Sequence, residues 1–148
     1  MRGGRPWLAI GFGLFVFLGI SALLARALTG SGNERARVLE VLQAQARGDA
    51  DAVLRDLPAC AGEPACVRLT RDRVAAMRRP GPVEILHYRP SVQVALTDST
   101  GTGRVAWRAD GSLPIVQCVR VTRGGPLSGA RLELLSISAP IPREAPCG

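Results

Sequence analysis

The sequence predicts an α+β fold in which one apolar N-terminal helix is followed by a group of shorter helices and then by an antiparallel sheet. Three observations lead to this prediction. Residues 7–25 contain no charged side chain. Between residues 33 and 79, apolar side chains recur at the spacing of amphipathic helices. From residue 83 onward, apolar and polar side chains alternate between closely spaced turn clusters, as in antiparallel strands.

The uncharged run over residues 7–25 is long enough to cross a membrane. A helix rises about 1.5 Å per residue, so roughly 20 apolar residues cover a hydrocarbon core of about 30 Å. Arg2 and Arg5 precede the run and favour a cytoplasmic N-terminus, and Trp7 suits the membrane interface. We therefore expect a basic stub and transmembrane anchor over residues 1–28 of a single-pass cell-membrane protein.

A cleaved secretory signal is the alternative interpretation of the same run. Ala25, Arg26 and Ala27 fit a small-x-small cleavage site. The apolar core of a signal peptide usually spans about 7 to 15 residues, which is shorter than this run, and Arg26 lies inside the cleavage site. A retained anchor is therefore favoured over a secreted form. In both cases the domain that follows residue 28 lies outside the cytoplasm.

All four cysteines follow the apolar run, and an even number in a small exported domain indicates two disulfides. Three pairings can be drawn. We favour Cys60 with Cys66, which closes a short loop, and Cys118 with Cys147, which ties the proline-rich C-terminal tail to a strand. A zinc site is not expected, because the spacing is unusual for zinc and the single histidine, His87, lies near neither pair. No metal or cofactor is therefore expected.

The net charge of +7 comes entirely from arginine, since the chain has no lysine. After residue 30, sixteen arginines are interspersed with twelve acidic residues. A nucleic-acid interface needs clustered positive charge, so no nucleic-acid partner is expected.

The helical region begins after a short linker at residues 29–32. Asn33 is a fair N-cap, and Gly48 is a natural residue just after the end of the helix that follows. The apolar face of this helix comprises Val38, Leu39, Val41, Leu42 and Ala46. The exported domain is therefore expected to span residues 33–148.

Two shorter helices are expected next. Asp49 can cap the first of them, which Pro58 ends. The second begins at Pro64, since proline suits the first helical position, and stops at residues 80–82. Its inner face comprises Val67, Thr70, Val74 and Met77.

Five strands are expected after residue 82, joined by short turns. The first two cover residues 83–88 and 92–96, with Val92, Val94 and Leu96 as the apolar face of the second, and residues 98–101 form a turn. Val105 and Trp107 mark the third strand. Asp110 and Gly111 are a strong hairpin signal before the fourth strand, where Ile115, Gln117, Val119 and Val121 share one face. Residues 131–139 form the last strand.

Residues 38–57, VLEVLQAQARGDADAVLRDL, resemble the opening of nuclear transport factor 2-like (cystatin-like) domains. In that superfamily an apolar helix ends in an Ala-x-x-Gly-Asp step before a short second helix. Here Ala46, Gly48 and Asp49 supply this step. The resemblance covers roughly residues 33–139. It implies a curved sheet wrapped around a long helix, forming a cone whose interior is either a ligand pocket or a packed core.

Some members of that superfamily are enzymes with an acidic base and a tyrosine or aspartate donor inside the cone. The polar candidates here are Tyr88, Asp98 and Gln117, but Asp98 falls in the expected turn and an amide is no base. No catalytic residue is therefore assigned. If the cone holds a pocket, Tyr88, Trp107 and Gln117 are the residues expected to line it.

The sequence thus predicts a non-enzymatic, membrane-anchored extracytoplasmic module that binds a partner protein or a small ligand at the cell envelope. A cone-pocket enzyme or carrier for a small apolar molecule is the alternative. The interior of the domain distinguishes them, because ligand sites usually have volumes of about 300 to 1,000 Å3.

Overall fold

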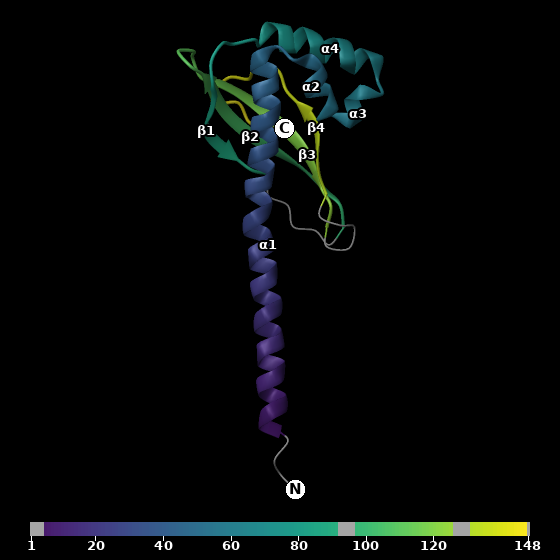
Figure 1. Cartoon of the computed structure of the whole chain (residues 1–148), viewed down its shortest axis with the longest axis vertical. Coiled ribbons are helices and arrows are strands. Elements are labelled where there is room, and N and C mark those ends of the chain that lie inside the picture. Colours follow the sequence, from purple (N-terminus) through teal and green to yellow (C-terminus); the bar gives the residue numbers. More distant parts are fainter. Residues whose placement is uncertain (1–4, 92–96, 126–130, 148) are drawn as a thin grey trace. The chain divides into compact units, whose positions relative to one another are not determined.

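The computed structural model describes residues 5–91, 97–125 and 131–147, except for the side chains of residues 5–9 and 26–31 (Figure 1). Contacts along the chain divide it into two units, Met1–Asn33 and Glu34–Gly148. Each unit is described by itself.

The first unit contains the beginning of helix α1, which runs from Arg5 to Arg47. The expected break at residues 29–32 is wrong, because these residues continue the helix and Asn33 lies inside it instead of capping a new one. Large apolar side chains between Ile10 and Leu24 are exposed around this part of α1. No helical stretch of the described residues is both long enough and apolar enough to cross a bilayer.

In the second unit, the last turns of α1 bury the apolar face that the sequence predicted. Val38 and Leu42 have no exposed surface. The helix ends at Arg47, and Gly48 follows it with a φ of 79°, a left-handed conformation that glycine adopts without strain. The expected end of this helix is confirmed.

Gly48→Val is expected to lower the free energy of unfolding by at least about 1 kcal/mol. Valine is strained at this φ, and a Cβ atom would lie 3.2 Å from Cδ of Arg78. Denaturant unfolding of the variant and of Gly62→Val measures the effect; a Cβ at Gly62 meets no atom within 4 Å. Equal stability of Gly48→Val and the wild type would contradict the prediction.

Three short helices follow: α2 (Ala50–Arg55), α3 (Pro58–Ala61) and α4 (Pro64–Ala76). Asp49 caps α2 as expected, since its side chain accepts a hydrogen bond of 2.9 Å from the amide of Ala52. Pro58 not only follows α2 but also begins α3, a single turn that the sequence analysis did not anticipate. The Cys60–Cys66 disulfide joins α3 to α4.

Within the residues that the structure describes, the sheet has four antiparallel strands in the order β1 (Val83–Arg89), β2 (Ser99–Ala109), β3 (Ile115–Arg123) and β4 (Leu132–Ile137). The strand expected at residues 92–96 lies outside the described residues. The turn expected at residues 98–101 is wrong, because β2 begins at Ser99, which pairs with Arg123 of β3. The expected α+β class is confirmed: helices pack with an antiparallel sheet.

One face of the sheet, here called the inner face, packs against the last turns of α1 (Figure 1). Val105 and Trp107 on β2 and Val119 and Val121 on β3 are almost completely buried, as the alternation predicted. In β1, Leu86 is an extra residue between the paired positions Ile85 and His87. This β-bulge allows Ile85 and Tyr88, three residues apart, to lie opposite inner-face residues of β2.

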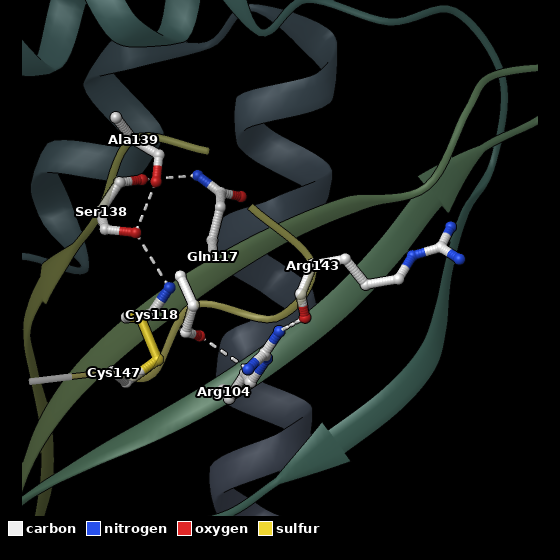
Figure 2. The surroundings of a disulfide bond; sticks show 8 residues. Arg104, Gln117, Cys118, Ser138, Ala139, Arg143 and Cys147 are labelled. Atoms are coloured by element: carbon white, nitrogen blue, oxygen red, sulfur yellow. Dashed lines mark hydrogen bonds between the residues drawn. A yellow bond between two sulfur atoms is a disulfide. The ribbon is translucent and has the colours of Figure 1, made fainter. Parts of the chain in front are cut away.

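The C-terminal tail, residues 138–147, continues beyond β4 along the edge of β3, and its last residues lie against the outer face of the sheet (Figure 2). The amides of Ser138 and Ile141 donate to the carbonyls of Cys118 and Val116, at 2.9 and 2.8 Å. The Cys118–Cys147 disulfide then holds the end of the tail. Both disulfides are the pairings that the sequence favoured, and they indicate an oxidising, extracytoplasmic environment.

Candidate functional site

Two of the three residues expected to line a pocket lie together in the interior. Nε1 of Trp107 donates to Oε1 of Gln117 at 2.7 Å, and Nε2 of Gln45 donates to the same oxygen at 3.3 Å. Nε2 of Gln117 donates to the carbonyl of Ser138 at 2.7 Å (Figure 2). All three interior side chains are at most 2% exposed. Here they fill the space between α1 and the sheet, and both the oxygen and the nitrogen of the buried Gln117 amide are hydrogen-bonded.

Tyr88 does not join this network but belongs to a second buried cluster, here called the Glu34 cluster, formed by Glu34, Tyr88, Ser91 and Arg123. The hydroxyl of Tyr88 donates to Oε1 of Glu34. The amide of Ser91 donates to the same oxygen at 3.1 Å, and the Ser91 hydroxyl lies 3.3 Å from Oε2. The guanidinium of Arg123 forms an ion pair with Oε2.

The Glu34 cluster is largely buried, and the backbone of β2 packs closely against it. Glu34 is completely buried and Ser91 is 4% exposed, whereas the Arg123 side chain keeps 25% of its exposure. Two glycines of β2 leave room for these side chains: a Cβ on Gly103 would lie 3.2 Å from Oε1 of Glu34, and one on Gly101 would lie 2.6 Å from Cβ of Ser91. Glycine at these positions serves close packing.

Burial raises the pKa of Tyr88 well above its ordinary value, because the buried site disfavours the phenolate. Burial also lowers the pKa of Arg123, since desolvation disfavours the guanidinium charge. Both groups keep the protonation states that allow them to donate to Glu34 around neutral pH.

Tyr88 is the only tyrosine, so the near-ultraviolet absorbance of phenolate reports its titration directly. We expect the folded protein to titrate above pH 10 and the urea-unfolded protein to titrate near pH 10. Because the folded state keeps a proton that the unfolded state loses, stability falls above pH 10, by about 1.4 kcal/mol per pH unit. Tyr88→Phe should lack this part of the loss. A midpoint near 10 in the folded protein would contradict the prediction.

The contacts around Glu34 suit a residue that stabilises the fold better than one that transfers a proton to or from a substrate. A general base must reach the substrate proton at hydrogen-bond distance. The Glu34 oxygens already accept from Tyr88, from Ser91 and from Arg123, and the carboxylate has no exposed surface. Glu34 was not predicted as a site residue, because a lone acidic residue beside an expected N-cap is typical of a surface charge in the first turn of a helix.

Two surface hollows lie away from this interior. One, of about 180 Å3, is lined by residues that include Arg37, Pro58 and Glu133. The other, of about 420 Å3 and here called the outer groove, lies on the outer face of the sheet, beside the C-terminal tail. Its lining includes Leu86, His87, Arg89, Arg104, Ala106, Pro114, Val116 and Arg143. Tyr88, Trp107 and Gln117 line neither hollow.

Within the described residues, no three histidine, cysteine, aspartate or glutamate side chains are grouped so that they could hold a metal ion. Asp98, the remaining polar candidate from the sequence, immediately precedes β2 and is exposed.

Comparison with protein-family models, with curated proteins and with solved structures found no match for this chain.

Proposed function

We propose that this protein is a non-enzymatic, membrane-anchored extracytoplasmic module that binds a partner protein or a small ligand through the outer face of its sheet. The observation that carries the proposal is the hydrogen-bonded packing of Trp107, Gln117 and Gln45 between α1 and the sheet. Side chains occupy the place where the enzyme or carrier alternative needs a pocket. The engaged oxygens of Glu34 support the same conclusion.

The anchor is part of the proposal and rests on the sequence. Residues 7–25 carry no charge, and Arg2 and Arg5 precede them. The large apolar side chains described in this segment are between 40% and 76% exposed, with Phe12 and Phe15 above 70%, and no protein surface covers them within their own unit. A bilayer around the segment accounts for this exposure.

The resemblance to nuclear transport factor 2-like domains, with its cone-shaped sheet, is also part of the proposal. Its support is the step at the end of α1, where Gly48 takes a positive φ and Asp49 caps the next helix.

The anchor is tested by the intact mass of the full-length protein extracted from a membrane fraction, with and without reduction and alkylation. We expect a mass that includes residues 1–28, with four cysteines that react only after reduction. A mass that begins near residue 28 would replace the anchor by a cleaved signal, and free thiols without reduction would contradict export.

Binding is tested with a photoreactive amino acid placed at one of two exposed leucines in the full-length protein. Leu86 lies in the outer groove and is 42% exposed, whereas Leu69 lies on α4 and is 49% exposed. We expect a discrete adduct of one partner or ligand from position 86 and not from position 69. Equal adducts at both positions, or none at position 86, would contradict binding through the outer face.

A further inference from the structure

The outer groove has an apolar floor at one end. Ala106 of β2 pairs with Val116 of β3, and Leu86, the bulge residue of β1, lies 42% exposed beside them. Pro114 lines the same end of the groove. Together these residues give this end of the groove apolar side chains from β1, β2, β3 and the segment that leads into β3, with His87 of β1 opposite Ala106.

The other end of the groove is cationic. Arg89 and Arg104 face each other across β1 and β2, and Arg143 of the tail lines the same hollow. Like charges placed directly opposite each other destabilise a sheet. No ion pair within the described residues involves any of these three arginines, and no lining residue is acidic. The positive charge is therefore left uncompensated.

The C-terminal tail borders the groove, and two sets of interactions hold it there. The guanidinium of Arg104 donates to the carbonyl of Ala145 at 2.7 Å and to that of Arg143 (Figure 2). The Cys118–Cys147 disulfide fixes the end of the tail. Both carbonyls are neutral, so they position Arg104 without cancelling its charge. Figure 2 shows the Arg143 side chain extending away from this contact.

The two ends of the groove are close together. Residues that share a face of one strand are about 7 Å apart, so the row of Arg89 and Arg104 is followed at that distance by the row of His87, Ala106 and Val116. An anion at the arginines would therefore place an attached chain over the apolar floor. The volume of about 420 Å3 is within the range of small-ligand sites.

We propose that the outer groove binds a single-chain aliphatic carboxylate, with its head group between Arg89 and Arg143 and its chain over Ala106 and Val116. The forked guanidinium matches a planar carboxylate in a bidentate contact. This inference rests on the proposed function, because it names the site and the ligand class for a module that binds through its outer surface.

The test uses full-length protein in nanodiscs and octanoate that carries a terminal diazirine. After irradiation, peptide fragment spectra assign the labelled residues. We expect labels on Leu86, Ala106 or Val116. The double substitution Arg89→Gln/Arg143→Gln should lower this labelling about a hundredfold, since it removes two charge-assisted hydrogen bonds and each is worth about a factor of ten.

Three controls accompany this experiment. Arg120→Gln removes an exposed arginine of β3 that does not line the groove, and it should leave labelling unchanged. Arg89→Lys/Arg143→Lys should restore part of the signal. Labels on residues 10–25 report the probe dissolved in the bilayer and should be equal in all variants.

Two results would overturn the inference: no label in the groove, or equal labelling by the uncharged alcohol with the same chain. If the photoreactive residue at position 86 still captures a discrete partner, the proposed function stands and only the proposed ligand class is wrong. Labels on Tyr88 or Trp107 would place the ligand in the interior, and the proposed function would fail as well.

Discussion

Glu34→Gln is expected to lower the free energy of unfolding of the extracytoplasmic domain by about 3 kcal/mol. The substitution keeps the shape of the side chain but removes its charge, and the amide group then points N–H donors toward Arg123 or Tyr88, which are donors themselves. Breaking a buried ion pair by changing one partner typically costs about 3 to 5 kcal/mol. Because Arg123 is partly exposed, we expect the loss for Glu34→Gln to lie at the lower end of this range.

Denaturant unfolding of the full-length protein in a mild detergent, followed by near-ultraviolet circular dichroism, measures the loss. Glu40→Gln is the matched control, because Glu40 pairs with Arg37 on the surface, where both side chains are more than half exposed. Such pairs contribute less than about 1 kcal/mol. Adding Arg123→Gln to Glu34→Gln should recover part of the loss. Equal effects of the two glutamate substitutions would show that the Glu34 cluster does not stabilise the fold.

Replacing Cys118 and Cys147 together by alanine is expected to destabilise the domain by about 3.5 kcal/mol, more than the loss of the Cys60–Cys66 bond. A disulfide lowers the conformational entropy of the unfolded chain, and this loss of entropy increases with the length of the closed loop. The separation is 29 residues for Cys118–Cys147 and 6 for Cys60–Cys66. The same relation gives about 2 kcal/mol for the shorter loop.

The two double-alanine variants and the wild type are compared by the same unfolding experiment under oxidising conditions. Reduction of the wild type should reproduce the sum of the two losses. A larger loss for the Cys60/Cys66 variant would contradict the loop-length argument and would point to packing at Cys60, whose sulfur lies 3.4 Å from the Thr70 hydroxyl.

Strands and helices in which apolar side chains recur at a regular spacing were predictable from the sequence. Val105 and Trp107 on β2, and Gln117, Val119 and Val121 on β3, lie inward as their alternation indicated. Alternation works here because one face of the sheet packs against α1 while the other carries the tail. Gly48 and Asp49 were also predictable, since helix ends depend on local chemistry.

Features that depend on distant contacts were not predictable. The cluster of Glu34, Ser91 and Arg123 joins three segments, and no local pattern marks a buried acid. Gly101 suggested a turn, but it lies in β2, where the absence of a Cβ lets Ser91 approach. The local capping signal at Asn33 was overridden by the continuation of α1. Two of the three expected pocket residues, Trp107 and Gln117, therefore lie in the packed core, and the outer groove depends on the path of the tail.

The order of the disulfides along the chain has a consequence for biogenesis. Each bond joins cysteines that are neighbours in the sequence, the first with the second and the third with the fourth. A chain that enters an oxidising compartment with its earlier residues first can form each native bond by joining a newly arrived cysteine to the one before it. No crossed pairing has to be rearranged by thiol–disulfide exchange. The protein should therefore mature with a thiol oxidase alone, and its second bond can close only after Cys147 has entered the oxidising compartment.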